Sequence, residues 1–581
     1  MNRIEHCRIT HSVLGRIAGL AARIAVPAAA CMAEGSIVER ESAFTIPLDI
    51  NADKAIRADR VWWKTVLVPR GSFLVRATVP HLQGAGGPVI GSWDTSLPRE
   101  AHQEISSRIS RGMEIAPVAG AVPFAVGDHA TATAGIMIGS GTRADSRGVA
   151  PMGRVKYFDN FNRDGELEAE ANAGLRLSNH SYGDPIGWHF DGAGAFGKGA
   201  AWFWFDTVQF GAYGEVARRR DEIVHNAPHH VAVFSAGNDR GPDHAGPSNG
   251  PHHFELRNGQ FQDVITVRPR DGAAGGFDTI GVLASAKNVL TVGSVEDILT
   301  YSGPASVIAS NHSSFGPTND GRIKPDVVAS GVNLTVPRSS SNGAYSTTFS
   351  GTSAATPTVT GGVALLMELA ELRYPDIVFG RGVTPNPAKP MLASSYKGLL
   401  IHTAEEAGPG PGPDFMFGWG LVNIEGAAKH IEADAAGSTT AMQELTLLPG
   451  ETFAMEVQTV SRPTSPAVGA LDLSRRVTLC WTDVPGTPPQ NLGDGGTQLV
   501  NDLDTRVVPV EGGASIRPWT LNRLFPAQAA TYGDNTQDNV ERIDFISVPN
   551  VRYRITVSHK ATLVGASQKF SLLTSGFVRV Q

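Results

Sequence analysis

The stretch Phe349–Pro357, F-S-G-T-S-A-A-T-P, most constrains what this chain can fold into. A glycine-containing turn there would deliver Ser353 to the first turn of a helix, because proline is tolerated near a helix start and damaging further in. Val359, Val363 and Leu366 follow at helical spacing, which predicts a buried helix. A serine at its start would lie beside unpaired N–H groups that stabilise developing negative charge. A lone serine there is more simply an N-cap, so partner residues elsewhere must decide.

Short apolar runs that end in glycine or a polar residue recur earlier in the chain. One ends at Asp94, within W-D-T-S, and another ends near Asn238, within S-A-G-N-D. Helical stretches such as 213–226 alternate with these runs, and this alternation predicts an α/β fold with a doubly wound, mostly parallel sheet. Sites in such folds form at the carboxyl ends of strands. Taken alone, however, Asp94 could equally cap the segment that follows it.

His129 begins the motif H-A-T-A-T-A-G, whose small residues predict a closely packed helix capped by Asp128. A single histidine at a helix start is more often structural than catalytic. The catalytic interpretation gains weight because an aspartate at a strand end and a serine at a helix start occur elsewhere in the chain.

The pattern of apolar and turn residues changes near residue 440. With 581 residues it is too long for one core, and we expect two large domains. Residues 45–430 carry the α/β pattern, whereas 440–581 show short strands, turn residues and no helical periodicity, which predicts an all-β sandwich domain. The strands expected in the sandwich are 444–448, 452–460, 476–481, 505–509, 543–548, 552–558 and 570–574.

In residues 1–35 several arginines precede a stretch of small residues, and this pattern predicts a leader or signal segment. Arg16 and Arg23 interrupt the apolar core that a signal peptide needs, so a lipid-modified Cys31 or a misplaced start codon are alternatives. Export would place the protein outside the cell or in the cell envelope. A mature chain would keep only Cys480, expected to be a buried small hydrophobe, and could form no internal disulfide.

Four motifs, in this order, together resemble the signatures of the subtilases, the subtilisin-like serine proteases. They contain Asp94, His129, Asn238 and Ser353, and the similarity runs from roughly 45 to 430. The tail, with L-V-N-D-L-D at 499–504, resembles the jelly-roll-like β-sandwich of one secreted bacterial branch of the family.

The resemblance implies a role for each of these residues. Ser353 would be the nucleophile, His129 the general base and then acid, and Asp94 the carboxylate that orients the imidazole. The Asn238 amide and the Ser353 backbone N–H would stabilise the oxyanion. The protein would then be a serine endopeptidase, a hydrolase that forms an acyl-enzyme and needs no cofactor for its chemistry.

The resemblance also implies how substrate binds. Ser181, Tyr182 and Gly183 would form an exposed edge that pairs with an extended peptide through main-chain hydrogen bonds. The expected substrates are extended or unfolded polypeptides, and we expect a monomer. The net charge of −7 provides no basic surface for nucleic acid, and no apolar run is long enough to span a membrane.

Acidic and amide residues of the tail could bind a structural Ca²⁺ ion, which takes oxygen ligands. The candidates are Asp502, Asp504, Asp534 and Glu541. Turn chemistry explains such Asn/Asp-rich loops equally well.

The chain departs from the family pattern at a few positions. Ser96 stands where a glycine is usual, and Ala130, Ala132 and Thr133 replace the usual residues after the histidine. None of these changes removes a catalytic group. Too few residues separate the leader from position 45 for the family's usual prodomain, so the enzyme folds unaided or its gene starts upstream.

Three other interpretations stay open. Sedolisins share S-G-T-S-A but use a glutamate base and an aspartate oxyanion donor, against which His129 and Asn238 argue. A surface protein with an inactive protease domain would usually have lost a triad residue. Transpeptidation or peptide cyclisation would need the same triad.

Overall fold

The computed structural model describes residues 82–113, 125–192, 196–240, 252–298, 300–374, 390–436, 442–460 and 471–580. It also contains three short strands outside these ranges, β1 (Arg40–Glu41), β2 (Trp62–Trp63) and β18 (Arg462–Pro463). The predicted leader, residues 1–35, lies outside the described residues.

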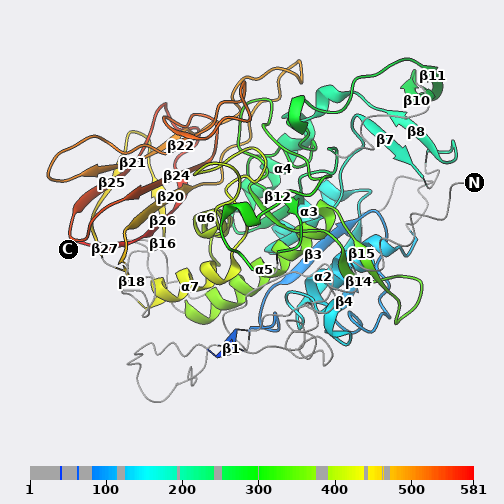
Figure 1. Ribbon diagram of the computed structural model, residues 1–581, viewed down its shortest axis with the longest axis horizontal. Helices are drawn as coiled ribbons and strands as arrows, with labels where there is room; N and C mark the ends of the chain where they lie inside the picture. Colours follow the sequence, from blue (N-terminus) through cyan, green and yellow to red (C-terminus); the bar gives the residue numbers. More distant parts are fainter. Residues whose placement is uncertain are drawn as a thin grey trace, which may run out of the picture.

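A seven-stranded, entirely parallel sheet forms the centre of the N-terminal two thirds of the chain, which confirms the predicted α/β fold (Figure 1). The strand order is β13-β12-β9-β6-β3-β5-β4, so the chain runs from β3 to the edge strand β4, returns to β5, and then crosses to β6 and continues to the other edge at β13. The strands are β3 (Val89–Asp94), β4 (Ile109–Arg111), β5 (Arg154–Asp159), β6 (Leu177–His180), β9 (Val231–Ser235), β12 (Leu290–Val295) and β13 (Val327–Ser330).

Helices cover both faces of this sheet. One core contains α2 (Asp128–Ile138), α5 (Thr352–Arg373), α6 (Ala393–Thr403) and α7 (Ile424–Ala435), and the other contains α3 (Arg163–Asn172) and α4 (Glu215–Asn226). Helix α5 is buried from Ala354 to Ala370, as the apolar spacing after Ser353 predicts. Short 3-10 helices are η2 (Ala144–Ser146), η3 (Thr207–Gln209), η5 (Ala274–Gly276) and η6 (Pro304–Ser306).

A row of aromatic rings crosses the four middle strands just before their carboxyl ends. Trp93 stacks on Phe158 at 4.3 Å and on His180 at 5.2 Å, and His180 stacks on Phe234 at 4.2 Å between ring centroids. These residues are also partners in the strand pairing, so the stacking reinforces the register of β5, β3, β6 and β9. Burial, together with the charge of Arg220, holds the pKa of His180 well below its ordinary value.

Two smaller sheets lie beside the central one. Strands β7 (Trp188–Asp191), β8 (Ala201–Trp204), β10 (His252–Arg257) and β11 (Gln260–Ile265) form a four-stranded sheet that the sequence does not predict. Strands β14 (Leu334–Pro337) and β15 (Tyr345–Phe349) form the hairpin that leads into α5.

Two four-stranded antiparallel sheets form the C-terminal β-region, residues 442–580, as the predicted sandwich requires. One contains β16 (Met442–Leu447), β26 (Gln568–Ser575), β20 (Ser474–Cys480) and β24 (Val540–Ile546). The other contains β21 (Leu503–Pro509), β25 (Arg552–His559), β17 (Phe453–Thr459) and β27 (Phe577–Arg579). A separate apolar core lies between them, and β19 (Leu471–Asp472), β22 (Trp519–Thr520) and β23 (Thr531–Tyr532) complete the region.

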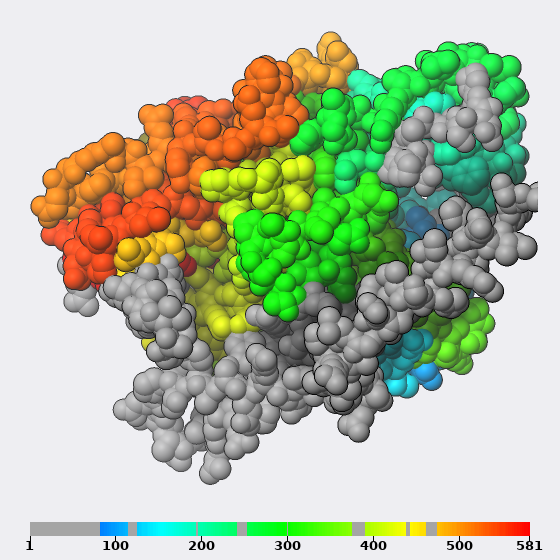
Figure 2. Space-filling view, in the orientation of Figure 1, coloured from blue at the N-terminus to red at the C-terminus, as the bar shows by residue number. Residues whose placement is uncertain are grey.

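The C-terminal β-region packs directly against the α/β region. In Figure 2 its orange and red surface lies against the yellow and green surface of the α/β region. A Cβ at Gly398 of α6 would lie 3.0 Å from both Cys480 and Leu573, so only glycine lets the helix approach the sheet this closely. The Cys480 thiol is buried in this contact, and burial raises its pKa to about 12, as expected for a structural cysteine.

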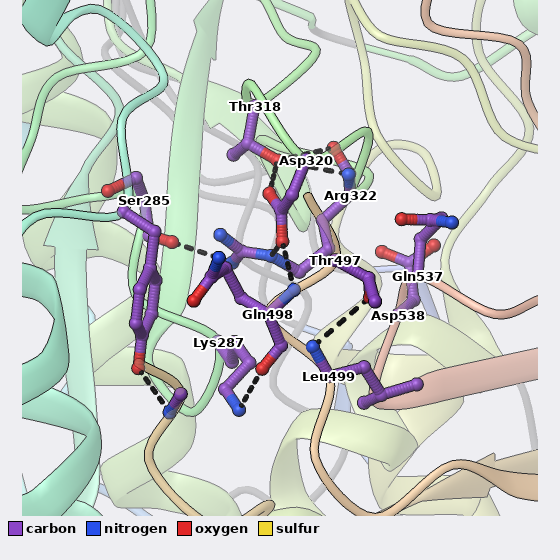
Figure 3. Close-up of polar contacts among 12 residues, drawn as sticks. Ser285, Lys287, Thr318, Asp320, Arg322, Thr497, Gln498, Leu499, Gln537 and Asp538 are labelled. Atoms are coloured by element: carbon purple, nitrogen blue, oxygen red, sulfur yellow. Dashed lines mark hydrogen bonds and ion pairs between the residues drawn. The ribbon is translucent and has the colours of Figure 1, made fainter. Parts of the chain in front are cut away.

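Buried charges also join the two regions (Figure 3). The Lys287 ammonium, fully buried before β12, pairs with Asp483 at 2.5 Å and donates to the carbonyl of Gln498 at 2.8 Å. Nearby, Arg322 pairs with Asp320 at 2.7 Å, and Asp320 accepts a hydrogen bond from the Gln498 backbone. The C-terminal β-region therefore supplies the counter-charge of Lys287 and a backbone donor to Asp320.

Removing one partner of this buried pair should destabilise the whole chain. We expect Asp483→Asn to lower the free energy of unfolding by about 3–5 kcal/mol, because it leaves the Lys287 ammonium buried without its counter-charge. Chemical denaturation of the full chain measures this. Glu456→Gln, which disturbs an exposed ion-pair cluster in the same β-region, is the matched control and should have a much smaller effect. Equal stabilities of the two variants would contradict the prediction.

Candidate active site

Three of the predicted site residues lie at one edge of the central sheet because their strands are parallel neighbours. Asp94 is the last residue of β3, Ser181 follows the end of β6, and Asn238 lies just beyond the end of β9. His129 and Ser353 are each the second residue of a helix, α2 and α5 respectively. Packing of α2 on α5 brings these two helix starts to the same edge.

The Asp94 carboxylate holds the His129 ring. His129 Nδ1 lies 2.8 Å from Asp94 Oδ1 and 2.9 Å from Oδ2, and Asp94 is 2% exposed. The same carboxylate accepts hydrogen bonds from the Thr95 backbone N–H at 2.7 Å and from Thr133 Oγ1 at 3.2 Å. A proton on Nδ1 satisfies this contact and leaves the lone pair of Nε2 directed elsewhere.

The pKa of His129 reflects two opposing effects. Burial lowers it, whereas the negative charge of Asp94 and the hydrogen bond to it raise it, and the net shift is upward from the ordinary value of 6.5. The imidazolium that would form on proton transfer is therefore stabilised by Asp94.

The Ser353 hydroxyl makes a different contact. Ser353 is partly exposed at the start of α5, and its Oγ donates to the Ser181 carbonyl oxygen at 2.8 Å. Within the described part of the chain, no hydrogen bond reaches His129 Nε2. The His129 ring instead lies edge-on to Phe349, with 5.8 Å between the ring centroids. Catalytic hydrogen bonds often form fully only once substrate is bound.

Two hydrogen-bond donors border a small space beside Gly351. A Cβ at Gly351 would lie 3.5 Å from Asn238 Nδ2 and 3.6 Å from the Ser353 backbone nitrogen. Asn238 Oδ1 accepts from the Thr352 backbone N–H at 2.9 Å, so the Nδ2 group is not used in that contact. Gly351 has φ of 140°, so a side chain is disfavoured there by backbone strain, although a Cβ would find ordinary van der Waals distances.

The sequence predicts an exposed edge at residues 181–183, but in the structure only Gly183 is exposed. Ser181 and Tyr182 are 1% and 5% exposed, and the Tyr182 hydroxyl lies 3.0 Å from His180 Nδ1 in the core. Gly183 is exposed, and a Cβ there would meet no atom within 4 Å. In this structure a ligand would therefore meet the segment at Gly183, whereas Ser181 and Tyr182 are covered.

The structure corrects one expectation at the histidine helix. Asp128 does not cap α2, because Gly127 is the N-cap residue and Asp128 is the first residue of the helix. The Asp128 carboxylate instead accepts hydrogen bonds from Arg338, which lowers its pKa to about 2, and from the Ser339 backbone at 2.7 Å. A partner so distant in sequence outcompetes the local capping contact.

Two departures from the family pattern have clear contacts. Ser96 Oγ accepts from the Ala130 backbone N–H at 3.3 Å and so satisfies one free donor at the start of α2. Thr133, in the unusual histidine motif, donates to Asp94, a role the sequence analysis missed. The sequence could have indicated this role, because Thr133 lies one helical turn after His129 and therefore on the same face of the helix.

The four predicted calcium ligands do not all meet. Asp502, Asp504 and Asp534 surround the ammonium of Lys560, whereas the fully buried Glu541 accepts a hydrogen bond from the Thr505 backbone at 2.5 Å. In the described residues no group of three or more His, Cys, Asp or Glu side chains is arranged to hold a metal ion. The structure does not confirm the predicted calcium site.

The comparison with known families agrees with this geometry. The model of the subtilase family, Peptidase_S8, matches residues 114–420, which is more than half of the chain. The chain belongs to the subtilase family. Its central parallel sheet is thus that of a subtilisin-like serine protease. Asp94 precedes the matched range, so its assignment depends on the motif and on its contact with His129.

Two curated relatives are similar over parts of their length. The serine protease AprX of Bacillus subtilis (strain 168) is 35% identical over 125 residues, which cover 20% of this chain and 26% of AprX. The serine protease/ABC transporter B family protein tagD of Dictyostelium discoideum is 25% identical over 330 residues, covering 45% of this chain and 17% of tagD. The matches thus span about a quarter of AprX and about a sixth of tagD.

Two solved protease structures match with low TM-scores. A mutant of the protease domain of PatA is 19% identical with a TM-score of 0.38, and covers 61% of this chain and 99% of its own. The prenylagaramide maturation protease PagA is 20% identical with a TM-score of 0.36, with the same coverage of 61% and 99%.

The Asp94 contact predicts how His129 titrates. In a Ser353→Ala background, NMR titration should give His129 a pKa above 6.5, and Asp94→Asn should lower it, because burial then acts without the opposing charge. His312, whose pKa burial and the charge of Arg240 lower to about 4, should titrate alike in both proteins. A His129 pKa unaffected by Asp94→Asn would contradict the contact.

Proposed function

We propose that the protein is a serine endopeptidase that hydrolyses peptide bonds in extended or unfolded polypeptides. The observation that carries this proposal is the pairing of His129 with the buried Asp94 at the sheet edge where Ser353 lies in the first turn of α5. Family membership supports the reaction class. The resulting roles are nucleophile for Ser353, general base and then acid for His129, and orienting carboxylate for Asp94.

Substrate would complete the nucleophile–base contact. Ser353 Oγ now donates to the Ser181 carbonyl, which is also a main-chain acceptor that an extended peptide could use. A peptide N–H that takes this acceptor frees the hydroxyl to turn towards His129 Nε2. His129 then removes the proton as Ser353 Oγ attacks the peptide carbonyl.

The space beside Gly351 suits the oxyanion of the tetrahedral intermediate. Asn238 Nδ2 and the Ser353 N–H would donate to it, and the positive end of the α5 dipole adds to the stabilisation. The protonated His129 would give its proton to the leaving amine, and water would then hydrolyse the acyl-enzyme at Ser353.

Several further expectations are part of the proposal. We keep the domain boundaries 45–430 and 440–581, export from the cell and a monomeric state as predictions. No helix in the described part of the chain is long and apolar enough to cross a membrane. The site residues proposed above need no metal or organic cofactor for this chemistry.

Isosteric replacement of the oxyanion donor tests the mechanism. Asn238→Asp keeps the acceptor for the Thr352 N–H but loses the Nδ2 donor and adds repulsive charge. We expect kcat on unfolded casein to fall by roughly 10²–10³-fold or more. This is the loss known for removal of such a donor from subtilisin itself. KM should change little, because the donor acts on the transition state.

Asn258→Asp is the matched control, since it makes the same chemical change at the exposed turn between β10 and β11. Ser353→Ala should leave no cleavage above background. Equal activity of wild type and Ser353→Ala would refute the proposal.

The pH profile separates the proposed mechanism from that of a sedolisin. The base must be neutral, and its pKa lies above the ordinary 6.5, so activity should fall as pH drops through that raised value. Highest activity in acid would instead favour a carboxylate base.

A further inference from the structure

The acidic cluster of the C-terminal β-region encloses a side-chain cation. Lys560 Nζ lies 3.0 Å from Asp502 Oδ2, 3.2 Å from Asp504 Oδ1 and 3.3 Å from Asp534 Oδ1. Asp502 Oδ1 at 3.1 Å and the Asn535 carbonyl oxygen at 3.3 Å also surround the nitrogen. Carboxylate and carbonyl oxygens are the donors that Ca²⁺ prefers, but here an ammonium group lies among them.

Strand pairing fixes Lys560 at this place. Lys560 follows β25, whose last residues pair with β21 as His559 with Leu503 and Ser558 with Asp504. The Lys560 backbone N–H donates to the Asp502 carbonyl at 3.1 Å and continues that pairing by one residue. The lysine and two of the three carboxylates are therefore held together by the sheet itself.

The distances suit an ammonium ion better than calcium. They are those of N–H···O hydrogen bonds, whereas Ca²⁺ binds oxygen at about 2.3–2.6 Å. An ion at the position of the nitrogen would require each oxygen to move inward by roughly 0.7 Å. Glu541, the fourth predicted ligand, does not contribute: its Oε2 bonds the Thr505 N–H, and its buried Oε1 has no partner among the described residues.

Charge balance favours the same assignment. Arg506 donates to Asp504 at 2.8 Å and also to Asp534, so two cations already face three carboxylates. Burial lowers the pKa of Lys560, but the hydrogen bond to Asp502 and the negative charges around it raise the pKa more, so the ammonium stays charged. A network of this kind contributes more than isolated surface pairs do.

We propose that Lys560 is the resident cation of the cluster formed by Asp502, Asp504 and Asp534, in place of a divalent metal ion. The β-region then keeps its stability without calcium. The proposal concerns folding stability and is independent of the proposed peptidase function.

Thermal unfolding of the full chain tests this, in a Ser353→Ala background that prevents self-digestion. With Lys560 present, the unfolding midpoint should be the same in chelator and in millimolar CaCl₂, and calorimetric titration with CaCl₂ should detect no binding. A midpoint that falls in chelator, or measurable calcium binding, would overturn the proposal in favour of a calcium site. This comparison requires no substitution within the cluster.

Replacement of the lysine provides the second measurement. Lys560→Met should lower the unfolding midpoint by several degrees, whereas Lys569→Met, which removes an exposed lysine from β26 of the same region, should change it little. Lys560→Arg keeps the charge and should retain most of the stability. Equal midpoints for Lys560→Met and Lys569→Met would overturn the proposal.

Discussion

The parallel direction of neighbouring strands is the constraint on which the site depends. Because β3, β6 and β9 run the same way, their carboxyl ends bring Asp94, Ser181 and Asn238 to one edge. The aromatic row from Phe158 to Phe234 fixes the register of these strands one step before that edge. Helices α2 and α5, packed on each other on one face of the sheet, then supply His129 and Ser353 from their first turns.

The C-terminal β-region is part of the same folded unit. Its strands β20 and β26 pack on α6 through Gly398, and Asp483 neutralises Lys287 shortly before β12 of the central sheet. A buried ammonium is costly unless it is paired, so the α/β region depends on this partner. The same region uses Lys560 as a cation among its own carboxylates.

The sequence predicted those features that depend on residues close together in the chain. The turn and apolar spacing around Ser353 predicted α5, and alternation of strands and helices predicted the parallel sheet. Contacts between distant segments could not be predicted in this way. The pairing of Asp128 with Arg338, 210 residues away, displaced the expected cap, and the place of Lys560 depends on how β25 pairs with β21. The segments that form β7, β8, β10 and β11 show no clear alternation of apolar and polar residues, so this sheet was not predicted.

Covalent labelling of the nucleophile tests the central claim most directly. A serine-directed phosphonate should label the wild-type chain once, peptide mapping should locate the label at Ser353, and Ser353→Ala should remain unlabelled. The account predicts this because His129, held by Asp94, activates that one hydroxyl. A folded wild-type protein that takes no label, or takes it at another residue, would contradict the account.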